Sequence, residues 1–163
     1  MTRRFVLIAL LALALAIPSI AFAQTPNFSG KWTQDMEKSD PMGGGGGGRA
    51  GGGGGARGPQ TLTYTQTATE LKIDREGPNG VTSTVYKLDG SDSVNAGGRG
   101  GDVTSKTTWD GNKLVTKYSR TMGENTVEVT ETRTLEGDEL VVVTAMKGGP
   151  NGDTTRKTVF KKG

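Results

Sequence analysis

Arginine, glutamate and tyrosine stand at alternate positions among the apolar residues of the second half of the chain. They are Tyr118 with Arg120, Glu131 with Arg133, and Arg156. Residues two apart in a strand point to the same face, so each pair shares one side of its segment. Guanidinium groups bind carboxylates and phosphates through paired hydrogen bonds. The spacing indicates either a floor that binds an anionic ligand, or arginines that lie at the mouth of a cavity and reach water.

Catalytic and metal-binding chemistry is narrowly limited, because the 163 residues include no histidine and no cysteine. This excludes serine–histidine and cysteine–histidine triads, thiolate or imidazole metal sites, and disulfides. Asp89, Asp110 and Asp138 each adjoin a glycine and are turn residues by their spacing. Glu131 has no partner with which to act as a general base. We therefore predict no catalytic residue, no metal site, no cofactor and no enzymatic activity.

The elements that must position these side chains are strands. The chain contains 23 threonines, and apolar residues alternate with polar ones over most of its length, a pattern typical of half-buried strands. Hydrophobic residues make up only 32% of the sequence, which indicates a thin core. No stretch after residue 23 has a helical period over more than one turn. The predicted strands cover residues 28–37, 61–67, 70–76, 81–88, 91–95, 102–109, 112–122, 125–135, 138–147 and 153–162.

Two-residue loops predict an antiparallel meander and its register. Glycine supplies the positive φ that such loops need. With Asp110-Gly111 as a loop, Thr107 faces Leu114. With Gly123-Glu124 and Gly137-Asp138 as the next two loops, one face collects the apolar side chains, as expected for a single consistent register. That face holds Val103, Trp109, Leu114, Tyr118, Val127, Val129, Leu135, Leu140, Val142, Met146 and Phe160.

The other face of this sheet is charged, and it determines the fold class. A transmembrane barrel would carry an apolar outer band, whereas the outward positions here are polar. We predict an all-β fold, an antiparallel up-and-down meander of about 8–10 strands. One face of this sheet is exposed to water and its open edges are unfavourable, so we expect the sheet to close into a barrel. A two-sheet sandwich is the alternative. The outward positions include Lys106, Lys113, Lys117, Glu128, Glu139, Lys157 and Lys161.

A barrel of this size is able to enclose a cavity for a small ligand. Many inward residues are short and polar, which favours a cavity. We predict a small hydrophobic or amphipathic ligand. The alternative is a non-catalytic structural or interaction module whose barrel interior is packed. The predicted ligand-binding residues are Arg133, Arg120, Tyr118, Arg156, Glu131, Thr144, Thr158 and Phe160.

The charged side chains on the inward face can be paired in two ways. Buried charges are costly unless they are paired. Glu131 and Arg156 both flank Thr144 in the predicted register, which indicates a buried pair and leaves Arg133 for a ligand anion. The alternative pairs Arg133 with Glu131.

Residues 1–23 have the pattern of a secretory signal peptide. Arg3 and Arg4 precede the apolar run 5–17, Pro18 breaks the run, and Ala21-Phe22-Ala23 matches an A-x-A cleavage site. We therefore predict a periplasmic or extracellular protein with one domain over residues 24–163. Removing two arginines lowers the formal charge from +3 to +1. The charge thus indicates no nucleic-acid partner and no membrane insertion, and nothing in the sequence indicates the oligomeric state.

A glycine-rich tract interrupts the strand pattern. Residues 41–59 contain 12 glycines and few apolar side chains, too little to offset the entropy of ordering. We predict a disordered insertion at residues 42–58, with a shorter tract at 96–101. Arginine–glycine tracts also bind RNA, but export and a low arginine content favour a flexible connection.

Residues 28–38 (FSGKWTQDMEK) contain Gly30-Lys31-Trp32, and this G-x-W pattern resembles the first strand of lipocalin-like (calycin) barrels. The stretches WDGNKLV, EGDELVVVTAMKG and RKTVFKKG resemble the last hairpins of the fatty-acid-binding-protein branch, and STVYKLDG resembles its middle strands. The resemblance implies a calycin barrel that binds a small hydrophobic molecule. The chain is also similar to small secreted proteins of environmental bacteria, a likeness that implies no function.

The resemblance also bears on individual residues. The arginine and tyrosine that would hold a fatty-acid carboxylate correspond to Thr158 and Phe160, while the family's other arginine corresponds to Arg133. The glycine tract stands where the family has its helical lid. Independently of the resemblance, we expect Trp32 to close one end of the barrel, with Lys162 covering its ring.

Overall fold

The computed structural model describes residues 25–41, 58–78, 80–97, 101–122, 125–150 and 152–163. The predicted signal peptide at 1–23 and the core of the predicted insertion, 42–57, lie outside these residues. All ten predicted strands are present, with bounds within two residues of those expected. In the described part of the chain, no helix is long and apolar enough to cross a membrane. The strands are β1 (Gly30–Asp35), β2 (Thr61–Gln66), β3 (Glu70–Gly77), β4 (Gly80–Lys87), β5 (Asp92–Ala96), β6 (Asp102–Asp110), β7 (Lys113–Met122), β8 (Asn125–Glu136), β9 (Glu139–Lys147) and β10 (Thr154–Lys162).

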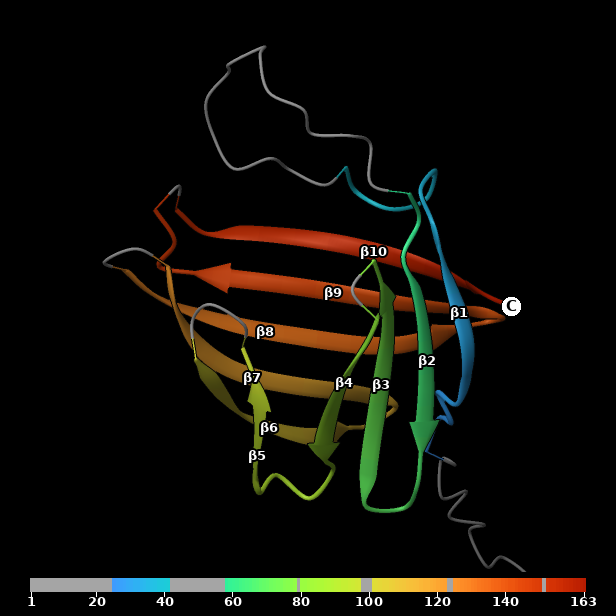
Figure 1. Ribbon diagram of the computed structural model, residues 1–163, viewed down its shortest axis with the longest axis horizontal. Coiled ribbons are helices and arrows are strands. Elements are labelled where there is room, and N and C mark those ends of the chain that lie inside the picture. Colours follow the sequence, from blue (N-terminus) through green and yellow to red (C-terminus); the bar gives the residue numbers. More distant parts are fainter. Residues whose placement is uncertain (1–24, 42–57, 79, 98–100, 123–124, 151) are drawn as a thin grey trace, which may run out of the picture.

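These strands form one antiparallel up-and-down sheet in the order β4-β3-β2-β1-β10-β9-β8-β7-β6-β5. The first strand pairs with the last, so the sheet curls into a nearly closed barrel. Figure 1 shows β1–β4 crossing in front of β6–β10 at a steep angle, with the two sheet edges β4 and β5 beside each other. The predicted barrel is thereby confirmed.

The register agrees with prediction from β7 to β10 and differs at one hairpin. Thr107 faces Thr116 rather than Leu114, because the two-residue loop consists of Gly111 and Asn112. Gly111 takes a φ of +58°, the conformation that the first position of a type II′ turn requires. The shift is two residues, and a strand has a period of two. Every side chain therefore keeps its predicted face.

The apolar core fills one end of the barrel. Trp32 is 2% exposed and donates from Nε1 to the carbonyl oxygen of Phe28 at 2.8 Å. Lys162 lies over its ring, with Nζ 5.7 Å from the centroid, as expected. Gly30 permits this contact, since a Cβ there would come within 3.1 Å of Lys162 Cε. The cluster comprises Phe28, Trp32, Leu62, Tyr64, Leu71, Ile73, Leu88, Leu114, Leu140 and Phe160.

Strands β4 and β5 meet without a backbone ladder in the described residues. Hydrogen bonds from side chains of β5 to the backbone of β4 take the place of this ladder. Asn95 accepts a hydrogen bond from the Val85 N–H and donates one to the Val85 carbonyl, both at 2.8 Å. Ser93 Oγ accepts from the Lys87 N–H at 2.8 Å. We call this line the seam; it completes the barrel wall.

Candidate functional site

A cavity of about 550 Å³ occupies the barrel interior beside the core. This volume is typical of small-molecule sites. The lining comes from eight strands, β2 to β5 and β7 to β10, together with Gln60, which directly precedes β2. All the predicted ligand-binding residues line it: Tyr118, Arg120, Glu131, Arg133, Thr144, Arg156, Thr158 and Phe160.

Arg133 is buried among polar and aromatic partners. It is 3% exposed, pairs with Glu131, and donates from Nη1 to Thr116 Oγ1 at 3.0 Å. Thr116 shares a further hydrogen bond of 2.9 Å with Thr107. The guanidinium carbon lies 5.3 Å from the centroid of the Tyr86 ring. Burial alone would lower the pKa of Arg133, but Glu131 and the nearby tyrosines outweigh it and the pKa is raised. Arg133 is therefore a fixed cation.

The predicted pairing of Glu131 with Arg156 is wrong. The two oxygens of Glu131 are taken by other groups: Tyr118 donates to Oε1 at 3.0 Å, and Arg133 binds Oε2. Arg133 stands two residues from Glu131 on β8, so both side chains leave the same strand on the same face. Arg156 stands two strands away, beyond Thr144. The nearer arginine takes the carboxylate.

Three tyrosines line the same cavity in their protonated form. Burial raises the pKa of Tyr64, of Tyr86 and of Tyr118. Glu131 raises the pKa of Tyr118 further, because its carboxylate repels a phenolate and accepts the phenol hydrogen bond. At neutral pH these side chains therefore offer O–H groups and aromatic faces, and no negative charge.

Sequence reasoning missed the opposite wall of the cavity. Tyr64 from β2, Arg75 from β3 and Tyr86 from β4 line it, but the predicted register began only at residue 103. The signal was present in the same alternation, since Leu62 and Tyr64, and Ile73 and Arg75, stand two apart. Extending the alternation to the first half of the chain would have found these residues.

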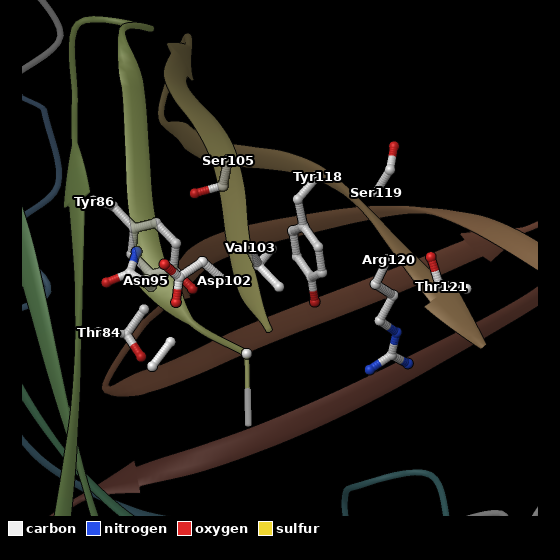
Figure 2. A pocket seen from close by; sticks show the side chains of 12 residues that line it. Thr84, Tyr86, Asn95, Asp102, Val103, Ser105, Tyr118, Ser119, Arg120 and Thr121 are labelled. Atoms are coloured by element: carbon white, nitrogen blue, oxygen red, sulfur yellow. The ribbon is translucent and has the colours of Figure 1, made fainter. Parts of the chain in front are cut away.

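A second hollow of about 460 Å³ adjoins the cavity near the seam. The two share Thr84, Tyr86, Ala96, Tyr118 and Arg120. Figure 2 shows Tyr118 and Arg120 on one side of this space, and Tyr86, Asn95 and Asp102 on the other. Because Arg75 and Arg120 are exposed, the cavity reaches water at this end.

The charges that line the cavity are unbalanced. Among the described residues that line it, four arginines, namely Arg75, Arg120, Arg133 and Arg156, face one carboxylate, Glu131. Arg120 is exposed and reaches water. Arg133 instead lies deep in the barrel and is paired. The described residues contain no cluster of three potential metal-ligating side chains of the His, Cys, Asp or Glu type.

Solved structures share this architecture. The zebrafish ileal bile acid-binding protein complexed with cholic acid matches with a TM-score of 0.56 and 15% identity, over 83% of this chain and 98% of that one. Fatty-acid-binding protein 1 of Echinococcus granulosus matches with a TM-score of 0.51 and 16% identity, over 83% and 96%. The fold is that of the fatty-acid-binding proteins. No family model matches the sequence, and no curated protein matches it significantly.

The likeness to these structures confirms the barrel fold that the sequence motifs implied. The three positions to which the sequence resemblance assigned a carboxylate-binding role, Arg133, Thr158 and Phe160, all line the cavity. Two of them offer no positive charge, and Arg133 is already engaged by Glu131. The cationic groups not engaged by a carboxylate lie elsewhere on the cavity wall.

Proposed function

We propose that the protein binds a small anionic amphipathic molecule inside the barrel and releases it unchanged. The observation that carries this proposal is the cavity of about 550 Å³, in which apolar side chains such as Leu62, Ile73 and Phe160 face arginines. Apolar walls with a few convergent polar groups are typical of ligand sites. The cavity also favours a binding protein over a module with a packed interior.

The chemistry of the cavity supports binding without catalysis. Glu131 is the one carboxylate that lines the cavity in the described part of the chain. Both of its oxygens are held, by Tyr118 and by Arg133, so it is not free to take a proton from a ligand. The known binders of fatty acids and bile acids with this fold support the same assignment by analogy of fold.

A cavity-filling variant tests the proposal. Thr144 is half-buried and lines the cavity, so Thr144→Trp places an indole where the ligand would lie. We expect it to weaken the binding of a dansyl-labelled fatty acid by roughly tenfold or more, about 1.4 kcal/mol. Thr104→Trp, at an exposed position on β6, is the matched control. Equal binding by both variants would contradict a ligand site in the barrel.

We also propose that the protein acts outside the cytoplasm, since residues 1–23 carry the features of an export signal. Cleavage after Ala23 should give a mature chain that begins at Gln24. N-terminal sequencing of the protein from the periplasm or the medium of its host checks this. A soluble product that retains Met1 would refute it.

A further inference from the structure

We propose that the outer part of the cavity binds a doubly charged oxyanion, the phosphate monoester head of the ligand, on Arg75, Arg120 and Arg156. The inference rests on the proposed function and names the head group that the cavity selects. It also sets the direction of binding, with the head toward the mouth and the apolar tail toward Ile73 and Phe160.

In the part of the chain that the structure describes, no carboxylate balances the positive charge of these three arginines. All three line the cavity, whose single carboxylate, Glu131, is held by Tyr118 and Arg133. In the described residues, none of the three forms an ion pair; the six ion pairs there involve other cations. Asp102 lines only the adjoining hollow. Three guanidinium groups around one space repel one another, and an anion removes that repulsion.

Arg156 supplies the sharpest sign of a missing partner. Its Nε is buried and has no hydrogen-bond partner, although buried polar groups are nearly always paired. An unpaired buried donor costs free energy, and a ligand oxygen in the cavity would offset that cost.

Arg120 reaches toward the same part of the wall. It extends away from β7 (Figure 2), and its Nη2 lies 3.3 Å from Met146 Sδ on β9. Met146 faces Thr154 across the β9–β10 ladder, and Thr144, two residues earlier on β9, faces Arg156. Arg120, which stands on β7, therefore reaches the stretch of β9 that pairs with the Arg156 part of β10. Arg75, on β3, lines the cavity from the opposite wall.

A monoester head suits this arrangement better than a carboxylate does. A carboxylate offers one charge and two oxygens, whereas a phosphate monoester carries about −1.5 to −2 charges at pH 7 and three strong acceptor oxygens. Guanidinium groups bind such oxygens in bidentate fashion. Arg75 and Arg120 are exposed, so a dianion here keeps contact with water and avoids full dehydration.

Isothermal titration of the mature protein with decyl phosphate, decyl sulfate, decanoate, decanol and inorganic phosphate tests the inference. All amphiphiles are kept below the concentrations at which they form micelles. We expect decyl phosphate to bind at least about tenfold more tightly than decanoate. Arg156→Met and Arg120→Met should remove that preference, and Arg156→Lys should retain part of it. Lys117→Met, at an exposed position on β7, is the matched control and should bind like the parent. Thermal melting checks that each variant folds.

Each outcome decides between the head-group inference and the wider function. Equal affinity for decyl phosphate, decyl sulfate and decanoate, with every arginine variant affecting all three alike, would overturn the inference and leave the proposed function standing. Inorganic phosphate binding as tightly as decyl phosphate, and lost in Arg156→Met, would support the oxyanion site but contradict an amphipathic ligand. Decanol binding as tightly as decyl phosphate would overturn the head-group role. Failure of all five probes would overturn both proposals.

Discussion

At the scale of single residues, Arg133 and Glu131 form an ion pair in the cavity wall, and their two charges balance each other. Arg133 is 3% exposed, with Glu131 and Thr116 as its hydrogen-bond partners. A buried ion pair is costly to break, because the remaining charge has no partner and little water. The pair therefore matters for folding, and the ligand is left to the other arginines.

Arg133→Met should destabilise the protein by about 3–5 kcal/mol, because Glu131 is left without its cation. Replacing both partners, in Glu131→Leu with Arg133→Met, should recover most of that loss, since apolar groups need no partner. Urea denaturation followed by fluorescence measures both. Arg156→Met should leave stability nearly unchanged, since Arg156 forms no ion pair among the described residues. A fully stable Arg133→Met would mean that Glu131 finds another partner.

At the scale of elements, the seam between β4 and β5 is held by two side chains where other neighbours share a ladder. Asn95 provides both a donor and an acceptor to Val85, and Ser93 accepts from Lys87. A side-chain amide placed this way reproduces the two hydrogen bonds that one residue of an antiparallel partner would make. The barrel wall depends here on Asn95 and Ser93.

Asn95→Ala should remove two hydrogen bonds and cost about 1–3 kcal/mol. We expect the loss to be local, because β4 and β5 remain paired with β3 and β6. Hydrogen exchange should therefore quicken at Val85 and neighbouring amides of the seam, while β8 and β9 keep their protection. Thr104→Ala, on the exposed face of β6, is the control. Unchanged exchange at Val85 would show that Asn95 does not hold the seam.

The turn after β1 is a second element that depends on one side chain. Asp35 accepts hydrogen bonds from the Glu37 and Lys38 N–H groups at 3.0 and 3.3 Å, and Lys161 Nζ lies 2.8 Å from Oδ2. Lys161 lowers the pKa of Asp35, burial opposes this, and the two backbone N–H groups lower it further. The folded state therefore favours the carboxylate form of Asp35.

This shift predicts an acid dependence of stability. A carboxyl group whose pKa is lowered by folding stabilises the protein above its ordinary pKa, near 3.9, and that contribution is lost as the pH falls through the lower, folded-state pKa. The Asp35→Asn variant should therefore have a lower melting temperature than the parent protein at pH 7. The difference between the two melting temperatures should shrink as the pH falls below about 4. Melting curves from pH 7 to strong acid measure this. A gap that stays constant over the whole range would refute it.

At the scale of the whole molecule, the barrel has two unlike ends. The apolar cluster with Phe28 and Trp32 fills one end, and Phe28 stacks on Trp109 with ring centroids 5.8 Å apart. The arginine-lined cavity occupies the other part of the interior. The amphipathic ligand that we propose has the same division, so the arrangement of the barrel would impose an orientation on it.

The glycine-rich tract permits a prediction about the whole chain. Residues 42–58 join β1 to β2, two strands that pair directly. Changing the length of a flexible loop costs only about 0.6 kcal/mol per doubling. Replacing the tract with a few glycine and serine residues should therefore leave the melting temperature within a few degrees, which calorimetry checks. A collapse of stability would show that the tract packs on the barrel.

The sequence by itself determined the strands and their faces. Alternation of apolar and polar residues is a local property with a period of two, so each strand could be placed from its own residues. The error at Asp110-Gly111 illustrates this: the loop moved by one residue and the pairing by two, yet Trp109 and Leu114 stayed inward. All the predicted ligand-binding residues consequently line one cavity.

Only the tertiary structure decided how the inward charges are shared. Glu131 flanks Thr144, as does Arg156, but the guanidinium that reaches both Glu131 and Thr116 belongs to Arg133. Likewise, closure of the barrel brings Arg75 from β3 into the cavity that β7 to β10 line, and sets Asn95 against Val85. Such pairings depend on how far each side chain reaches and on competition among neighbours that are distant in sequence. The alternation of apolar and polar residues along a strand contains no information about either.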